Sequence, residues 1–327
     1  MDIGFFLPAR GPLATPDGVR TMARRGEDLG YAYIGVPDHI VIPTDIEPRY
    51  PYSDSGEFPG GASGDCMDQL AVLSYLAGQT SKVRLLSSIM VVPHRPPVLA
   101  AKMLATVDVL SGGRLTVGCG VGWMREEFEA IGAPPFKERG LVANESIQAF
   151  RELWTSDAPA FDGTYVRFSN INFLPRPVQQ PHPPIWIGGE STPAMKRAAR
   201  LGDAWYPIGS NPTFPLDTLE RYRDAVSRLH QYAEDGGREP AEITLAYCAL
   251  RWSASEYGAA QPGTGDTAAG GGRRLLTGSP EELAEDIDAL GALGVRHLIL
   301  NFQSTELEET LERMARFAED VRPLVTA

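Results

Sequence analysis

Short apolar runs alternate with amphipathic segments along the whole of this 327-residue chain. Runs with the length and composition of buried strands occupy Ile3–Leu7, Tyr31–Val36, Val83–Val92, Arg114–Gly120, Pro184–Gly188, Ala204–Pro207, Ile243–Leu250 and His297–Phe302. The helical patterns that follow them, one after each strand, occupy Asp17–Leu29, Asp68–Thr80, Pro96–Leu110, Asn144–Thr155, Thr192–Leu201, Leu216–Ala233, Pro280–Leu293 and Glu306–Val321. Strands that are apolar throughout are typical of a parallel sheet covered by helices. Eight such units predict a single-domain (β/α)8 TIM barrel over residues 1–327. A doubly wound open sheet is the alternative, because alternation does not prove closure.

Three long segments interrupt the alternation, at about residues 40–67, 156–183 and 251–278. Loops that follow the strands of such a barrel lie at its C-terminal face, where active sites are built. The first and third segments follow strands, and we expect them to line a binding site. The stretch "GTGDTAAGGGRR" at residues 263–274 is expected to be mobile and to become ordered over a ligand.

The charge balance excludes several kinds of partner. The chain has 30 Lys and Arg against 42 Asp and Glu, a net charge of −12, and no extended basic cluster, which argues against nucleic acid and anionic membranes. No uncharged apolar stretch reaches about 18 residues and no signal peptide is evident, so we expect a cytoplasmic protein that acts on a small molecule. Cys66, Cys119 and Cys248 are scattered, which predicts reduced thiols and no metal site.

The stretch "IWIGGES" at residues 185–191 places a polar turn between a predicted strand and a predicted helix. Gly188 and Gly189 let the backbone come close to a ligand, and Ser191 can cap the helix or offer its hydroxyl. A helix start attracts anions, and phosphate above all. The turn including Glu190 is therefore a candidate phosphate site, with a simple helix cap as the alternative.

His39 lies near the end of the run "YIGVPDHI", just after the second predicted strand. A histidine there points into the barrel mouth and is the candidate catalytic acid or base, with a structural role as the alternative. Asp38 beside it is a candidate helix cap or supporting partner, and His94 competes for the catalytic role.

The run "VGCGVGW" at residues 117–123 brings glycines to the end of the fourth predicted strand. We interpret Gly120 and Gly122 as backbone cleared for a flat ring with Trp123 as a wall, and a bulge that helps the barrel close is the alternative. Aromatic residues in the insertions favour a hydrophobic or aromatic substrate; the candidate walls are Tyr50, Tyr52, Phe58 and Trp252.

Taken together, three stretches resemble one family: "SSIMVVPHRPPVLAAKMLATVDVLSGGRLTVGCGVGW", "REEFEAIG" and "LPRPVQQPHPPIWIGGES". They resemble the bacterial luciferase-like superfamily and, within it, the branch of coenzyme F420-dependent oxidoreductases. The resemblance implies a TIM barrel with insertions after strands that binds a flavin or deazaflavin at its C-terminal face. Because members of the family often dimerise through barrel helices, we also expect a homodimer.

The resemblance also assigns roles to residues. Ser88 and Ile89 match a position where the family often has a non-prolyl cis peptide that supports the ring from behind. His39 matches a histidine that acts as acid or base or binds substrate. Residues that border the ring match Gly120, Gly122 and Trp123, and the segment that contacts the cofactor phosphate matches Gly188, Gly189, Glu190 and Ser191.

Two departures bear on the mechanism. Where F420-dependent dehydrogenases of small alcohols and sugar phosphates carry a Trp, this chain has the sequence Ile-Val-Ile at residues 40–42. Where they carry a catalytic Glu, this chain has Trp123 or its neighbour, and Glu126 or Glu127 from the next helical turn is a candidate substitute. We therefore do not expect this protein to oxidise such substrates by their mechanism.

The leading hypothesis is an F420-dependent oxidoreductase that transfers a hydride to or from an organic, apolar substrate. Only four of the 30 basic residues are lysines, a bias typical of GC-rich genomes, and this favours F420 over FMN. The first alternative is an FMNH2-dependent monooxygenase, and another is a non-catalytic flavin- or deazaflavin-binding protein. An aldolase or isomerase barrel is disfavoured, because none of the four lysines maps to a strand end.

Overall fold

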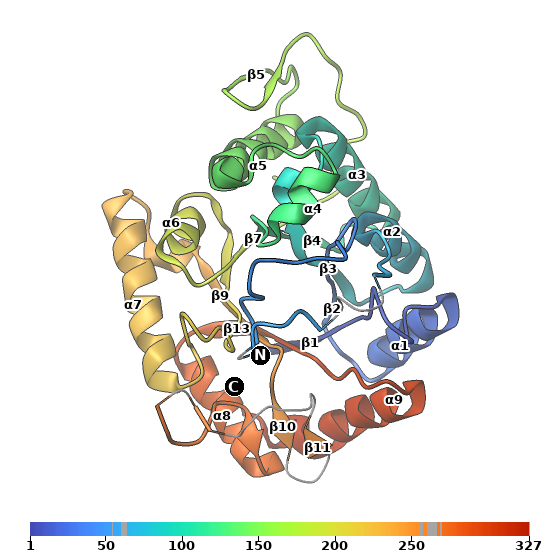
Figure 1. The fold of residues 1–327 in the computed structure, drawn as a ribbon, viewed down its shortest axis with the longest axis vertical. Coiled ribbons are helices and arrows are strands. Elements are labelled where there is room, and N and C mark those ends of the chain that lie inside the picture. Colours follow the sequence, from blue (N-terminus) through green and yellow to red (C-terminus); the bar gives the residue numbers. More distant parts are fainter. Residues whose placement is uncertain (54, 60–63, 255–257, 260–266, 269, 327) are drawn as a thin grey trace.

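The computed structural model describes residues 1–53, 55–59, 64–254, 258–259, 267–268 and 270–326. Within them, eight parallel strands close a barrel in the order β1-β13-β9-β8-β7-β4-β3-β2 (Figure 1). In chain order these strands are β1 (Asp2–Phe6), β2 (Tyr33–Val36), β3 (Arg84–Val91), β4 (Leu115–Gly120), β7 (Ile185–Gly188), β8 (Ala204–Tyr206), β9 (Thr244–Ala249) and β13 (Val295–Leu300). All eight predicted strands are present to within about two residues at each end, and the pairing of β1 with β13 closes the barrel and excludes the open sheet.

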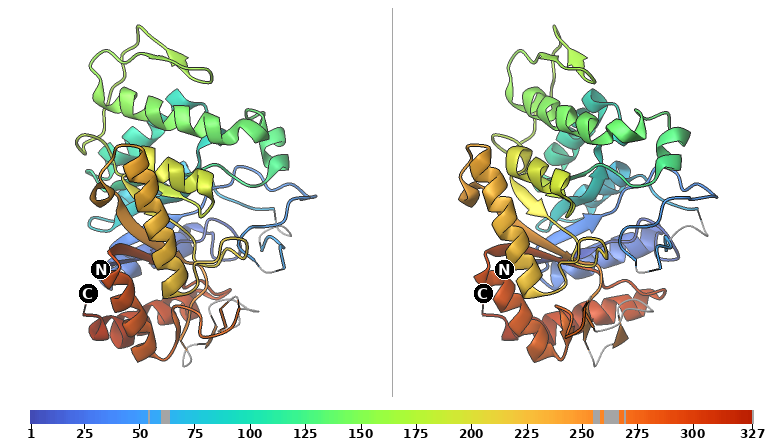
Figure 2. Two further views of the ribbon diagram at one scale, coloured as in Figure 1. Left: turned by 90° about the vertical axis from the view of Figure 1, so that its left-hand side faces the viewer. Right: turned by 60° about the vertical axis from the view of Figure 1, so that its left-hand side comes forward.

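Helices surround the barrel on the outside (Figure 2). The described ones are α1 (Pro16–Asp28), α2 (Gln69–Gln79), α3 (Pro97–Leu110), α4 (Arg125–Ala130), α5 (Arg139–Thr155), α6 (Thr192–Leu201), α7 (Leu219–Asp235), α8 (Pro280–Ala292) and α9 (Leu307–Arg316). Local signals fix several of their starts: Ser279 and Glu282 form a capping box on α8, and Thr15 accepts a hydrogen bond from the Gly18 N–H of α1. In the described part of the chain, no helix is long and apolar enough to cross a membrane.

Four features depart from the predicted elements. Helix α5 begins at Arg139 rather than at Asn144, and a short helix that the sequence did not predict, α4, precedes it. The last helical pattern divides, because α9 is followed by a π-helical turn over Phe317–Val321 and a 3-10 turn over Arg322–Leu324. Single 3-10 turns occur at Val92–His94, Phe136–Glu138 and Pro240–Glu242.

The insertions carry small sheets of their own. The second insertion pairs β5 (Phe161–Asp162) with β6 (Arg167–Phe168) beyond the end of α5, away from the barrel mouth (Figure 1). The third pairs β10 (Ser253–Ala254) with β11 (Gly258–Ala259) and β12 (Thr277–Gly278). Part of the stretch at residues 263–274 that was expected to be mobile lies outside the described residues.

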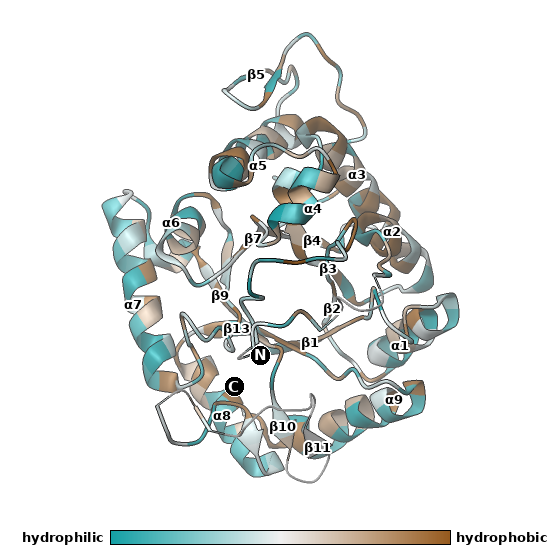
Figure 3. Cartoon of the chain, viewed as in Figure 1, coloured by the Kyte–Doolittle hydropathy of each residue, from teal (hydrophilic) through white to brown (hydrophobic). Residues whose placement is uncertain are grey.

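Two apolar clusters fill the protein. The larger one lies between the barrel and its helices, and the smaller one fills the barrel interior with side chains such as Phe6, Leu86, Trp186 and Ile299. A filled interior leaves the strand ends and the loops after them as the place for ligands. Among the helices, α2 and α3 are the most hydrophobic over their whole surface (Figure 3).

Candidate active site

The carboxyl ends of the barrel strands surround a cavity of about 380 Å³. The predicted catalytic and cofactor-binding residues all line it: His39, Ser88, Ile89, Gly120, Gly122, Trp123, Gly188, Gly189, Glu190 and Ser191. The first insertion contributes Tyr50, Tyr52 and Phe58, as predicted. Trp252 is not part of the lining: it is buried and donates from Nε1 to the Asn301 carbonyl at 2.7 Å, so its prediction as a pocket wall is wrong.

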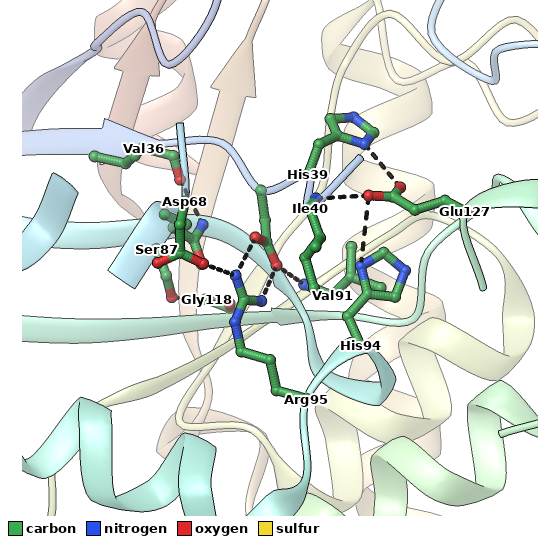
Figure 4. Close-up of polar contacts among 12 residues, drawn as sticks. Val36, His39, Ile40, Asp68, Ser87, Val91, His94, Arg95, Gly118 and Glu127 are labelled. Carbon is green, nitrogen blue, oxygen red and sulfur yellow. Dashed lines mark hydrogen bonds and ion pairs between the residues drawn. The ribbon is translucent and has the colours of Figure 1, made fainter. Parts of the chain in front are cut away.

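A histidine–carboxylate pair lies at one side of this pocket (Figure 4). The Nδ1 of His39 is 2.9 Å from Oε2 of Glu127, whose side chain is only 1% exposed. The other carboxylate oxygen accepts hydrogen bonds from the backbone N–H groups of Ile40 at 2.7 Å and Val41 at 3.3 Å. An ionised carboxylate only accepts hydrogen bonds, so it holds the imidazole proton on Nδ1 and leaves Nε2 as an acceptor.

Glu127 resolves the choice that the sequence left open between two neighbouring glutamates. It lies in the first turn of α4 and lines the pocket, whereas Glu126 lies outside the lining and accepts from the Glu47 N–H at 3.1 Å. Burial acts to raise the pKa of Glu127, but the hydrogen bond and charge of His39, together with His94 and the Ile40 N–H, outweigh it and lower that pKa below its usual value. Glu127 is therefore ionised at neutral pH.

His94 lies behind the pair instead of in the pocket. Its Nδ1 is 3.9 Å from Oε1 of Glu127, and its ring packs edge-on against Phe128 with a centroid distance of 4.7 Å. Burial lowers the pKa of His94, so this imidazole is neutral near pH 7. The competing prediction of His94 as the catalytic residue is not supported, because it is absent from the pocket lining.

A buried ion-pair network fixes the backbone next to His39. Asp38 receives both terminal nitrogens of Arg95, at 2.7 and 2.8 Å, and also accepts the Val91 N–H at 2.9 Å. Arg95 reaches Asp68, the N-cap of α2, with the same guanidinium (Figure 4). Asp38 therefore acts as a supporting partner, as one of its two predicted roles supposed, and ties the ends of β2 and β3 together.

Gly120 at the end of β4 and Gly188 at the end of β7 make room for one side chain. A Cβ at Gly120 would lie 2.4 Å from Cδ1 of Ile89, and a Cβ at Gly188 would lie 2.5 Å from the same atom. These glycines thus make room for the Ile89 side chain, which follows the cis peptide bond between Ser88 and Ile89. Both glycines and Ile89 line the pocket, and the cis bond itself is as the resemblance implied.

The turn after β7 has the geometry of an anion site. Gly189 has a φ of +108°, a conformation that favours glycine, and the Ser191 hydroxyl caps α6 by accepting from the Ala194 N–H at 3.4 Å. The Thr192 N–H, at the first helical position, has no carbonyl within the helix to accept it. The Ser191 hydroxyl and the Thr192 N–H can both donate to a bound anion. The geometry is therefore compatible with a phosphate site as well as with a simple helix cap.

Glu190, in the same turn, is bound to the segment after β8. Its two carboxylate oxygens accept from the Ile208 N–H at 2.6 Å and from Nδ2 of Asn211 at 2.8 Å. Burial raises the pKa of Glu190 to about 7, although these two hydrogen bonds act to lower it. The glutamate therefore ties the β7 turn to the segment after β8.

Two features of the site were not anticipated from the sequence. The Tyr206 hydroxyl at the end of β8 lies 2.9 Å from the Ser88 Oγ and lines the pocket floor. Arg10, four residues beyond the end of β1, is the cation of the described lining. Arg10 follows a predicted strand and Tyr206 lies near the end of one, and a polar residue at such a position was the available signal.

Comparisons with known proteins agree with this geometry. Residues 1–256 match the family described as luciferase-like monooxygenase. The FMNH2-dependent dimethylsulfone monooxygenase of Pseudomonas putida is 31% identical over 308 residues, which cover 82% of this chain and 81% of that protein.

Two solved structures share the fold. A monooxygenase of Streptomyces bottropensis has a TM-score of 0.72, 23% identity and 99% coverage of both chains. The F420-dependent tetrahydromethanopterin reductase of Methanopyrus kandleri has a TM-score of 0.72, 17% identity and 99% coverage of both chains. The chain therefore belongs to the luciferase-like monooxygenase family of enzymes.

Proposed function

We propose that this enzyme is an F420-dependent oxidoreductase that transfers a hydride between the deazaflavin and an apolar organic substrate. The observation that carries the proposal is that one pocket joins a phosphate-binding type of turn to a histidine–carboxylate pair. Gly188, Gly189 and Ser191 would hold the phosphate end of the cofactor, beside the Glu190 loop. When bound, the deazaflavin supplies or accepts the hydride.

The chain's own residues account for the rest of the chemistry. Ile89, Gly120, Gly122 and Trp123 would border the ring and keep water from the transfer centre. His39 would take a proton from the substrate at Nε2, or return it there, because Glu127 keeps the other proton at Nδ1.

The donors of the turn suit a singly charged phosphate better than a doubly charged one. The phosphate of FMN is a monoester with a charge between −1.5 and −2 at pH 7, whereas the phosphate of F420 is a diester with one charge. Of the carboxyl groups in the described lining, Glu127 is ionised, Asp38 is paired with Arg95, and burial raises the pKa of Glu190 to about 7, while Arg10 is the cation of that lining. A turn that offers a hydroxyl and a backbone N–H beside these carboxyl groups suits the less charged phosphate.

A second candidate is an FMNH2-dependent monooxygenase. The observation that favours it is the 31% identity to the Pseudomonas putida enzyme over most of both chains. The same pocket would then hold FMN, and the aromatic residues of the first insertion would face the substrate.

The test is an equilibrium titration of the purified protein with F420 and with FMN, followed by tryptophan fluorescence. We expect F420 to bind at least about tenfold more tightly than FMN, and Trp123→Phe to remove much of the quenching. Ser191→Ala should weaken binding, whereas Ser279→Ala, which removes the matching helix cap of α8, should not. Tighter binding of FMN would favour the monooxygenase, and binding of neither would refute the phosphate interpretation.

A further inference from the structure

Arg10 places a cation in the pocket without an anionic partner in contact. Its guanidinium carbon lies 4.4 Å from the centre of the Phe58 ring, and the residue lines the pocket. Among the residues that the structure describes, Arg10 forms neither a side-chain hydrogen bond nor an ion pair. Asp65 acts on its charge only from a distance, and burial lowers the pKa of Arg10.

A guanidinium in this state is a strong site for an oxyanion. Arginine stays charged at any physiological pH and presents five N–H donors in a planar fork that matches a carboxylate. Removing such a charge from water without a partner is costly, and a bound anion offsets that cost. Packing on Phe58 holds the fork in place before a ligand arrives, so little conformational entropy is lost on binding.

The barrel topology separates Arg10 from the proposed phosphate site. Strands β1 and β7 are four positions apart in either direction around the eight-stranded barrel, so the segments that follow them lie on opposite sides of its mouth. Arg10 follows β1, and the turn at residues 188–191 follows β7. His39 follows β2, which pairs directly with β1. Arg10 is therefore on the side of the acid–base pair, opposite the phosphate turn.

Aromatic side chains surround this side of the pocket. The Phe58 ring contacts His39 at a centroid distance of 5.1 Å, Tyr50 at 5.3 Å and Trp123 at 5.5 Å. Phe58 is thus shared by the cation and by the acid–base histidine. A ligand bound here meets a flat apolar wall, a fixed positive charge and a proton acceptor.

We propose that Arg10 binds the carboxylate of the substrate, and that the substrates of this enzyme are aromatic or otherwise planar carboxylic acids. This inference rests on the proposed function, because it assigns the substrate side of the same pocket. It places the carboxylate at the β1 edge, the planar group against Phe58 and Trp123, and the reacting atoms beside His39.

The test compares an aromatic acid with its uncharged amide. Cinnamate and cinnamamide are titrated by calorimetry into the full-length protein, with and without the more tightly bound of F420 and FMN. We expect the wild type to prefer cinnamate by about tenfold or more, the range for a hydrogen bond to a charged group. Arg10→Gln should abolish the preference, Arg10→Lys should keep part of it, and each should leave cofactor affinity unchanged. Arg125→Gln, which removes a cation outside the lining, is the matched control.

Several results would overturn the inference. One is equal affinity of the wild type for acid and amide, or no binding of either. Another is a loss of cofactor affinity in Arg10→Gln, which would assign Arg10 to the cofactor. A thermal unfolding curve for each variant separates these results from misfolding, and Arg10→Lys provides the readout where Arg10→Gln does not fold. Failure of the wild type to bind F420 or FMN counts against the proposed function instead, and the cofactor-free titration still tests Arg10.

Discussion

Replacing Glu127 with Gln should move the imidazole proton of His39 from Nδ1 to Nε2 while preserving the shape of the site. One oxygen of Glu127 accepts two backbone N–H groups, from Ile40 and Val41, and the other faces Nδ1 of His39. The single oxygen of Gln must stay with the backbone donors, so its NH2 group takes the place that faces His39. An NH2 donor requires an unprotonated Nδ1, and the imidazole proton then moves to Nε2.

The size of the effect follows from these contacts. With its proton on Nε2, His39 presents a donor to the pocket and cannot accept a proton from the substrate. The reaction rate should therefore fall roughly 100- to 10,000-fold, the usual contribution of a general acid or base. Exchanging charge-assisted hydrogen bonds for neutral ones at a site that is 1% exposed should lower the free energy of unfolding by roughly 1–3 kcal/mol.

The assay does not depend on knowing the substrate. Long-range ¹H–¹⁵N spectra of protein labelled on histidine distinguish the two tautomers of each imidazole, and His39→Gln identifies the His39 signals by their absence. We expect an Nδ1–H tautomer in the wild type and an Nε2–H tautomer in Glu127→Gln, with unchanged cofactor affinity. Glu126→Gln, which lies outside the pocket lining, is the matched control. An unchanged tautomer in Glu127→Gln, or full turnover by it, would refute this account of the pair.

Three further changes test other parts of the structure. Gly120→Ala places a Cβ 2.4 Å from Cδ1 of Ile89 and should push that side chain into the pocket, weakening cofactor binding about tenfold or more and costing roughly 1–3 kcal/mol; unchanged titration and urea unfolding would contradict this. Glu190 has a folded-state pKa of about 7 against an ordinary value of 4.5, so the native state binds the extra proton and its contribution to stability falls by about 3 kcal/mol as pH rises from 4.5 to 7. Glu190→Gln should lack this component in urea unfolding at pH 5 and pH 8, and an identical pH dependence in both proteins would count against it. We also propose a homodimer through α3, where Leu99 is 52% and Leu110 59% exposed: sedimentation should give a dimer that Leu99→Glu dissociates, and a wild-type monomer would exclude it.

The barrel could be predicted from the sequence because its strands and most of its helices are determined locally. Buried strands are nearly continuous apolar runs, and helices such as α8 carry their own start signal in Ser279 and Glu282. Helix α4 lacks such signals: it has six residues, no side-chain cap at Met124 and a buried glutamate in its first turn. A segment of this kind is stable only through tertiary contacts, and local pattern does not reveal those contacts.

In the candidate site, the positions of the residues could be predicted from the sequence, but their contacts could not. Strand ends of a barrel converge on one face, so His39, Ser88 and Gly188 could be placed together before any contact was known. What each residue touches depends on chain segments far away in sequence: Glu127 is 88 residues from His39, and Gly188 clears space for Ile89, from another strand. The glycines were correctly identified as cleared backbone, but the side chain that fills the space belongs to β3. Arg10 was missed for a related reason, since an arginine in an acidic protein is distinctive only once the described residues around it are seen to offer no ion-pair partner.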